Sequence, residues 1–330
     1  MMEHALPLRQ FRAMGCDMSA ALSMPSGAQA DALLAQVPAW FAHWERMFSR
    51  FRADSELSRV NAQAGQAVTV SAEFLTVVQK AVNVSERTQG LLTPLIGQAV
   101  LAMGYDRDFA QLHSCELTQS SRHPATYQGT PVHAVADFRH IHCDHARLQI
   151  RIPAGSRLDL GGFVKGWCAD ETVRRLGKFA PALMDAGGDI AVSAAMIDAL
   201  DKAQAWPIAI ARPWPETEDL ALIGVTRGGV ATSGRDYRRW IRDGQVQHHI
   251  VDPRTAQAAQ TDIVSVSVSA ASAFEAEVVA KHLLILGSEL AQAWAQPARR
   301  EHGRCARRAG RTAAAGCSPP PRPRSAGPPY

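Results

Sequence analysis

The sequence predicts a fold that mixes α-helices and β-strands. Apolar residues recur at helical spacing over 28–48, the pattern of a helix with one buried face. Segment 263–270 alternates apolar residues with serine, which is the period of a strand. At 158–170 a strand end, a glycine pair and a helix follow one another. Both kinds of element are therefore expected along the whole chain.

Caps and breaks place the remaining elements. A first strand is expected over 10–24, interrupted at Met14-Gly15, where glycine permits a bulge or a close backbone approach. Asp54 or Ser55 can cap a short helix. The other expected elements are a helix over 71–88 capped by Ser71, a short helix over 98–103, a surface insertion over about 107–131, two strands within 140–152, a helix through Leu176, a strand over 208–212 and a helix over 271–286.

Length and composition limit the class of protein. The 330 residues, 46% of them hydrophobic, suffice for one large or two ordinary domains. No apolar run reaches the roughly 18 residues that cross a bilayer, so no membrane span is expected. The N-terminus has no charged start followed by a long apolar segment, which predicts a cytoplasmic protein without a signal peptide. The six cysteines form no CxxC pair, which favours neither a disulfide framework nor a zinc site.

The net charge of +4 comes from the end of the chain. Residues 297–330 hold eight arginines and one glutamate, so 1–296 carry 27 basic and 30 acidic side chains. A mildly acidic body argues against a nucleic-acid-binding protein, which needs a basic face on a folded domain. The composition of 297–330, rich in Arg, Pro and Ala, cannot form a core. This tail is therefore predicted to be disordered, and a shift of reading frame in the gene would produce such a sequence.

The segment DLGGFVKGWCAD at 159–170 is the most informative local pattern. Glycines at the entrance of a helix let backbone N–H groups approach an anion, and the helix N-terminus favours negative charge. Lys165 adds a point charge. The spacing is not that of a P-loop, so the pattern indicates a phosphate-bearing ligand without specifying which.

A second polar segment is HHIVDPRT at 248–255. Proline removes a backbone donor and fixes φ, so a strand is expected to end near Asp252. Polar residues at the end of a strand are a common place for a site. Taken alone, however, adjacent histidines before a turn are more often surface residues than catalytic ones.

These segments, read in order, resemble the FAD:protein FMN transferase family, also called ApbE-type flavin transferases. The resemblance covers about residues 10–290, and the DLGGxxKG and HIxDPxT elements are highly specific together. The matching segments are AMGC at 13–16, FSRFRADSELSRVNAQAG at 48–65, GLLTPLIG at 90–97, DLGGFVKGWCAD at 159–170, LMDAGGDI at 183–190, ATSGRDYRRW at 231–240, HHIVDPRT at 248–255 and SVSVSAASAFEAEVVAKHLLILG at 265–287.

The resemblance implies an α+β fold of the ApbE/T-fold-like flavin transferase architecture, with mixed sheets and flanking helices. It implies that 1–296 form the flavin transferase domain. The family reaction moves FMN from FAD onto a Thr or Ser hydroxyl of a target flavoprotein and releases AMP. FAD is then the substrate, and the partner is a protein that carries the acceptor hydroxyl.

The resemblance also implies roles for individual residues. His249 matches the family histidine proposed as the base, Asp252 is expected to orient that loop, and Arg254 to pair with a phosphate. Phe51 stands where an aromatic ring stacks on the ligand. The positions that match flavin-nucleotide contacts are Met14, Phe51, Leu91, Leu92, Thr93, Asp159, Lys165 and Val251.

The magnesium site implied by the family is altered in this chain. The carbonyl of Gly162 matches one Mg²⁺ ligand, but Glu277 and Lys281 stand where the family has Asp and, four residues on, Thr or Ser. Glutamate can bind Mg²⁺, whereas a charged lysine has no lone pair. Either Mg²⁺ binds weakly, or the Lys281 ammonium, one helical turn from Glu277, takes the place of the cation.

Two alternatives to FMN transfer remain open from the sequence. With water in place of the acceptor hydroxyl, the same site would be an FAD pyrophosphatase that gives FMN and AMP. The substitution at Lys281 and the unusual tail also allow an FAD-binding protein without turnover.

Overall fold

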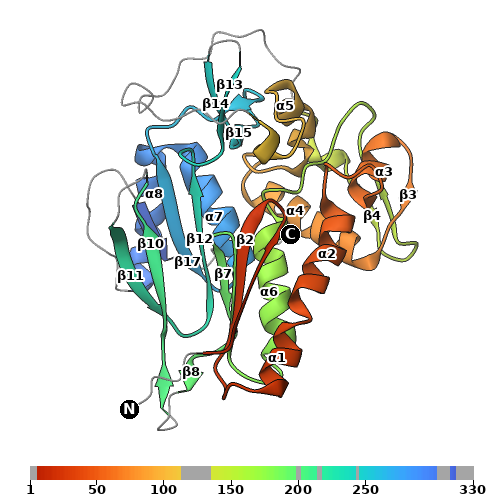
Figure 1. Ribbon diagram of the computed structural model, residues 1–330. Helices are drawn as coiled ribbons and strands as arrows, with labels where there is room; N and C mark the ends of the chain where they lie inside the picture. Colours follow the sequence, from red (N-terminus) through yellow and green to blue (C-terminus); the bar gives the residue numbers. More distant parts are fainter. Residues whose placement is uncertain are drawn as a thin grey trace, which may run out of the picture.

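The computed structural model describes residues 6–112, 135–197, 202–213, 218–242, 245–302 and 313–316. Its centre is a seven-stranded sheet in the order β1-β2-β6-β7-β12-β17-β18 (Figure 1). Neighbouring strands are antiparallel except β17 and β18, which are parallel. The strands are β1 (Leu8–Ala13), β2 (Cys16–Leu22), β6 (Ala182–Ala186), β7 (Asp189–Val192), β12 (Gly228–Gly234), β17 (Ser265–Ala270) and β18 (Ala313–Gly316).

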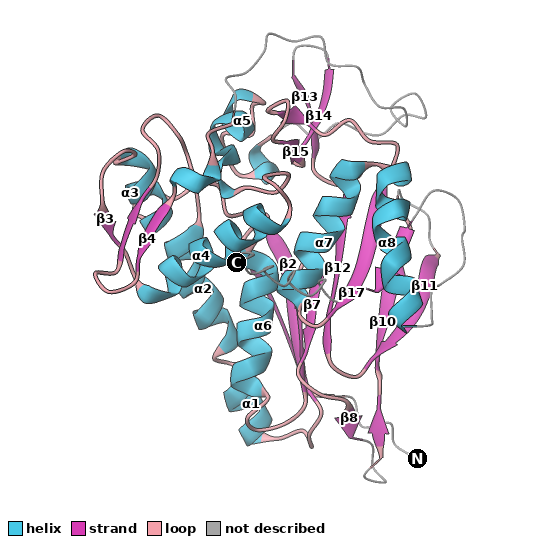
Figure 2. Ribbon diagram, turned by 180° about the vertical axis from the view of Figure 1, so that it is seen from behind, coloured by secondary structure: helices cyan, strands magenta, loops and turns pink. Residues whose placement is uncertain are grey.

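Each face of the central sheet is covered by a different element. Helices α6 (Val164–Leu176) and α7 (Ala273–Leu286) pack on one face, and α8 (Ser288–His302) lies against α7 (Figure 2). On the other face, the hairpin of β10 (Trp206–Ala211) and β11 (Asp219–Val225) forms a smaller apolar cluster with sheet residues. The mixture of antiparallel sheet and segregated helices is an α+β fold, so the expected fold class is confirmed.

The main core lies between the sheet and the N-terminal helices. It contains an aromatic group in which Phe41, Trp44 and Trp167 meet edge to face and Phe48 stacks on Phe74.

The helices of this N-terminal part are α1 (Ala28–Leu34), α2 (Val37–Phe48), α3 (Glu56–Ala62), α4 (Ala72–Arg87) and α5 (Gly97–Ala102), with 3₁₀ turns η1 (Pro94–Ile96), η2 (Phe109–Gln111) and η4 (Phe138–His140). The short pairings are β3 (Val68–Thr69), β4 (His142–Asp144) and β5 (Gln149–Arg151), β8 (Met196–Ile197) with β9 (Ala203–Gln204), β13 (Arg239–Arg242) with β14 (Gln245–His248), and β15 (Val251–Asp252) with β16 (Gln257–Ala258).

Two expected elements are divided in the structure. The strand expected over 10–24 is the hairpin β1–β2, in which Met14 and Gly15 form a two-residue turn with φ of 49° and 69°. Such turns need positive φ at both positions, which the Met-Gly pair supplies at the cost of one strained residue. The helix expected over 28–48 breaks into α1 and α2, because Pro38 would clash with a carbonyl one turn earlier in a continuous helix.

The caps expected from the sequence are present. Ser55 accepts a hydrogen bond from the backbone N–H of Ser58 at the start of α3, and Ser71 accepts one from Phe74 at the start of α4. The expected insertion over 107–131 lies outside the described residues from 113 onward. Within 297–330 the structure describes only the end of α8 and β18, so the domain boundary and the disordered tail remain predictions.

Close packing of α6 against α7 depends on Gly166. A β-carbon added at Gly166 would lie 2.7 Å from the carbonyl oxygen of Ala273. Asp170 also joins the helices, because its carboxylate accepts hydrogen bonds from the backbone N–H groups of Ala273 and Phe274 (2.8 and 3.0 Å). The first turns of α6 and the start of α7 are therefore fixed relative to each other.

Asn61 fixes the segment that leads into α6. Its side chain donates to the carbonyl of Leu158 at 3.0 Å and accepts from the N–H of the same residue at 2.7 Å. Asn61 is buried, so both backbone groups of Leu158 depend on it for hydrogen bonds.

We expect Asn61→Ala to lower the free energy of unfolding by about 2–4 kcal/mol, because two buried backbone groups lose their partners. Asn83→Ala is the matched control, since Asn83 is an exposed helical residue whose side chain accepts a hydrogen bond from Gln79, and should cost less than about 1 kcal/mol. Urea unfolding of both variants measures the difference. Equal losses would contradict the role given to Asn61.

Candidate functional site

The expected site residues come from loops and element ends beside the central sheet. Strands β13, β14 and β15 and helix α5 lie together above that sheet in Figure 1. The loop before α6 carries Asp159 and Gly162. Side-chain contacts link these segments.

Asp159 organises the loop that enters α6. One carboxylate oxygen accepts the backbone N–H of Gly161 at 2.8 Å, and the other lies 3.2 Å from the guanidinium Nε of Arg50. The backbone N–H of Asp159 donates to the carbonyl of Pro94 at 2.8 Å. Asp159 therefore ties the loop to both η1 and the segment after α2, and both of its carboxylate oxygens have partners.

Phe51 presents an exposed ring next to this loop. The Arg50 guanidinium lies 4.3 Å from the centre of the Phe51 ring and 4.1 Å from that of Tyr105. The ring of Phe51 is 42% exposed although its centre is only 5.8 Å from that of Tyr105. Arginine stacking holds the pair of rings in place, which leaves one face for a planar ligand.

Lys165 forms a buried ion pair with Asp189 at the start of β7. Burial alone would lower the pKa of Lys165, but the carboxylates of Asp189 and Glu277 outweigh it and raise that pKa. Lys165 therefore stays charged at neutral pH. From the sequence, Lys165 was expected to lie near a phosphate. In the structure, Asp189 already neutralises part of the charge of Lys165.

Glu277 and Lys281 meet the loop at Gly162. The Lys281 ammonium donates to the carbonyl oxygen of Gly162 at 3.1 Å and lies 3.5 Å from Oε1 of Glu277. The other oxygen of Glu277 accepts the backbone N–H of Gly166 at 3.0 Å. Burial and the nearby Asp189 raise the pKa of Glu277, and the two lysines oppose that rise.

The three residues expected at a magnesium site do not fit Mg²⁺. The oxygens of Gly162 and Glu277 face a common point, but Nζ of Lys281 lies at that point. A charged ammonium offers no lone pair and repels a divalent cation. Among the described residues, no three His, Cys, Asp or Glu side chains form a cluster suited to a metal. The misfit itself follows from the position of Lys281.

His249 is held neutral beside several cations. Burial, followed by the charges of Arg238, Lys281 and Lys165, holds the pKa of His249 well below its usual value. Its Nδ1 atom is buried and has no hydrogen-bond partner among the described residues. A neutral imidazole with an open nitrogen can accept a proton at neutral pH.

Asp252 and Arg254 form the turn after His249. The guanidinium of Arg254 donates from Nε and Nη2 to the two oxygens of Asp252 at 2.9 and 2.8 Å. The backbone N–H of Ala256 also donates to the carbonyl of Asp252 at 2.8 Å. Asp252 therefore holds this turn together through its side chain and its carbonyl, and Arg254, which was expected at a phosphate, already has a carboxylate on it.

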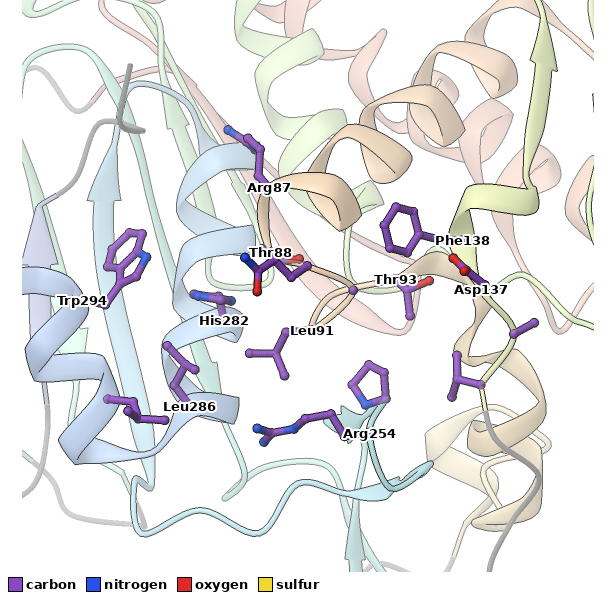
Figure 3. A pocket seen from close by; sticks show the side chains of 16 residues that line it. Arg87, Thr88, Leu91, Thr93, Asp137, Phe138, Arg254, His282, Leu286 and Trp294 are labelled. Atoms are coloured by element: carbon purple, nitrogen blue, oxygen red, sulfur yellow. The ribbon is translucent and has the colours of Figure 1, made fainter. Parts of the chain in front are cut away.

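A cavity of about 800 Å³ lies beside this turn. Figure 3 shows Leu91 and Thr93 on one side, His282 and Leu286 from α7 on another, and Arg254 at the edge. Ligand pockets commonly have this volume. The sequence-based set missed the α7 and α8 side of the cavity: His282 lies within the recognised segment at 265–287 but was assigned no role, and Trp294 lies beyond that segment.

Of the eight expected ligand contacts, only Leu91 and Thr93 line the cavity. Leu92 is buried in the main core, and Val251 is buried in a smaller apolar cluster with Tyr105. Met14 occupies the β1–β2 turn and is only partly buried. None of these three is among the residues that line the cavity.

Arg238 is a charged site residue that the sequence-based set missed. Its guanidinium Nη2 lies 2.9 Å from Sγ of Cys16, just after the Met14-Gly15 turn. Arg238 is also one of the charges that lower the pKa of His249. Its segment ATSGRDYRRW was recognised, but the segment has four arginine or aspartate residues, and the sequence gives no signal for which of these side chains turns inward.

The architecture is that of the solved ApbE flavin transferases. The ApbE protein of Thermotoga maritima superposes with a TM-score of 0.74 over 90% of this chain and 92% of that chain, at 20% identity. The flavinyl transferase ApbE of Pseudomonas stutzeri gives 0.70 over 89% of each chain, at 19% identity. At these identities the likeness establishes the fold.

The sequence establishes the family. The ApbE family model matches residues 14–304. The FAD:protein FMN transferase of Treponema pallidum is 31% identical over 277 residues, which cover 79% of this chain and 73% of that protein. The FAD:protein FMN transferase of Vibrio cholerae is 26% identical over 83% of this chain and 79% of that protein. The chain therefore belongs to the ApbE family, and the resemblance read from its motifs is confirmed.

The two neighbouring histidines make stability depend on pH. Burial lowers the pKa of His248 to about 4, while an unfolded histidine titrates near 6.5. Between these values the unfolded state binds more protons, so stability falls as pH decreases below about 6.5. We expect His248 alone to cost roughly 2 kcal/mol of unfolding free energy between pH 7 and pH 5.

Urea unfolding at the two pH values measures this loss. His248→Gln should reduce the pH dependence, whereas His140→Gln, at an exposed histidine, should leave it unchanged. An unfolding free energy that is equal at pH 5 and pH 7 in the wild-type protein would contradict the buried neutral state.

Proposed function

We propose that the protein is an FAD:protein FMN transferase that moves FMN from FAD to a Thr or Ser hydroxyl of a target flavoprotein and releases AMP. Membership of the ApbE family and the names of the relatives support this activity. The observation that carries it is His249, an imidazole with an unpaired ring nitrogen, whose pKa is lowered by burial and by the charges of Arg238, Lys281 and Lys165. No helix of the described residues is long and apolar enough to cross a membrane.

The reaction needs one proton acceptor. The acceptor oxygen attacks the phosphorus of the FMN half of FAD, the bond from that phosphorus to the bridging oxygen breaks, and AMP leaves. His249 takes the hydroxyl proton, which its neutral state allows. A positioned base typically contributes about 10²–10⁴-fold to the rate.

The reaction also needs positive charge, because negative charge shifts to the departing phosphate. The charged groups around His249 are Lys165, Arg238 and Lys281. Fixed cations in a partly buried site stabilise such charge more strongly than in water. Asp189 and Glu277 hold the two lysines in place, so the cations are positioned before the substrate arrives.

The flavin nucleotide has two kinds of surface available. The exposed ring of Phe51, braced by Arg50 and Tyr105, suits stacking against a planar ring system. The cavity lined by Leu91, Thr93 and other residues supplies an enclosed volume beside the turn of Arg254. We infer that the nucleotide spans these surfaces, with its pyrophosphate near Lys165.

Incubation with FAD and an acceptor flavoprotein that carries a reactive threonine tests the activity. In-gel fluorescence detects covalent flavin on the acceptor, and chromatography measures free FMN, AMP and FAD. Covalent flavin with one AMP per transfer is the expected result. Free FMN with AMP alone would identify a pyrophosphatase, and bound, intact FAD would identify a binding protein without turnover.

We expect His249→Ala to slow transfer by about 10²–10⁴-fold while FAD affinity changes little, because the residue acts on the proton and not on binding. Single-turnover assays and FAD fluorescence titrations measure the two effects. His140→Ala, at an exposed histidine distant in sequence, is the control and should retain full activity. Unchanged turnover in His249→Ala would rule it out as the base.

The rate of FMN transfer should not fall as the pH drops through the range in which an ordinary histidine becomes protonated. Because the pKa of His249 lies well below its ordinary value, the base stays unprotonated from pH 8 down to pH 6. We therefore expect kcat/KM for FAD to be level across this range. A decline of about tenfold centred near pH 6.5 would contradict the lowered pKa.

A further inference from the structure

Two lysines and two carboxylates form a buried cluster where α6, α7 and β7 meet. Lys165 pairs with Asp189, and Lys281 lies 3.5 Å from Glu277. The side chains of Asp189 and Glu277 are each only 3% exposed. The two positive and two negative charges cancel, so the cluster is balanced without another ion.

The Lys281 ammonium has defined partners on two sides. It donates to the carbonyl of Gly162 and faces Oε1 of Glu277. A lysine ammonium has three donors, and the described residues supply these two acceptors. The remaining donor is available for an anion in the loop ahead of α6.

The position of this ammonium is fixed by packing. Its side chain is 17% exposed, and a β-carbon added at Gly162 would lie 3.2 Å from both Cε and Nζ of Lys281. Glu277 is one helical turn away on α7 and is itself held by the N–H of Gly166. Asp170 attaches the start of α7 to α6. Lys281 therefore cannot leave this point without disturbing several buried contacts.

We propose that Lys281 is a built-in cation that contacts a phosphate oxygen of FAD and makes this enzyme independent of Mg²⁺. The proposal rests on the proposed function, because it concerns the same nucleotide site. The oxygens of Gly162 and Glu277 that could ligate a divalent ion instead face the ammonium. The lysine supplies one positive charge with a directed hydrogen bond, and a metal would have to displace it.

Binding of FAD tests the proposal separately from transfer. Fluorescence titration gives the Kd of the full-length protein for FAD in EDTA and in MgCl₂. We expect the wild-type values to agree within about twofold. A Kd that improves tenfold or more on adding Mg²⁺ would overturn the proposal, whereas no FAD binding in either condition would overturn the proposed function together with it.

Substitutions of Lys281 sharpen the test. Lys281→Thr removes the ammonium and supplies an oxygen, so its affinity for FAD should fall about 10- to 100-fold in EDTA, as for a lost charged hydrogen bond, and recover with Mg²⁺. Lys281→Met keeps the length without charge or a good ligand, so its affinity should fall without recovery. Lys178→Thr, at an exposed lysine just after α6, should behave as the wild type.

Electron paramagnetic resonance measures metal binding directly when Mn²⁺ is used in place of Mg²⁺, so this readout does not depend on the affinity for FAD alone. With FAD present, Lys281→Thr should remove about one equivalent of the free Mn²⁺ signal at a concentration where the wild type removes none. Circular dichroism and thermal unfolding confirm that each variant is folded. Wild-type affinity for FAD in EDTA in a folded Lys281→Thr protein would show that the ammonium is not a ligand contact.

Discussion

The contact between α6 and α7 is the constraint on which the site depends. Gly166 lets the two helices touch, and the carboxylate of Asp170 caps α7 from α6. This contact brings Lys165 on one helix next to Glu277 and Lys281 on the other. Charges so deeply buried are tolerated only when paired, and the pairing in turn fixes where each ammonium points. The packing of two helices thereby sets the electrostatics of the loop at Gly162.

A second consequence of burial is the neutral histidine. Cations that suit a phosphate also disfavour a positive imidazole, so Lys165, Arg238 and Lys281 keep His249 unprotonated. The same arrangement of buried side chains thus supplies both the positive charge that would hold the substrate and the neutral base that would activate the acceptor. The same burial makes the protein less stable in mild acid, which links the chemistry of the site to the stability of the fold.

Much of this could be predicted from the sequence, because short motifs fix local chemistry. Ser55 and Ser71 identified helix starts, and the glycine pair before Lys165 identified the loop that enters α6. Contacts between residues far apart in the sequence were harder to predict. The pairing of Lys165 with Asp189 joins residues 24 positions apart through sheet topology, and the orientation of Arg238 toward Cys16 depends on the packing of two distant turns. Pro38 could have predicted the break between α1 and α2, but the apolar stripe continues on both sides of it and favoured a single helix.

The central claim is that FAD is cleaved by transfer to a protein hydroxyl at a site whose cation is part of the chain. Phosphorus-31 NMR of a reaction in EDTA, with FAD and the acceptor flavoprotein, follows every phosphorus atom. We expect the pyrophosphate signals to be replaced by one monoester signal from AMP and one diester signal on the acceptor. Two monoester signals without a diester, or pyrophosphate signals that persist until Mg²⁺ is added, would contradict it.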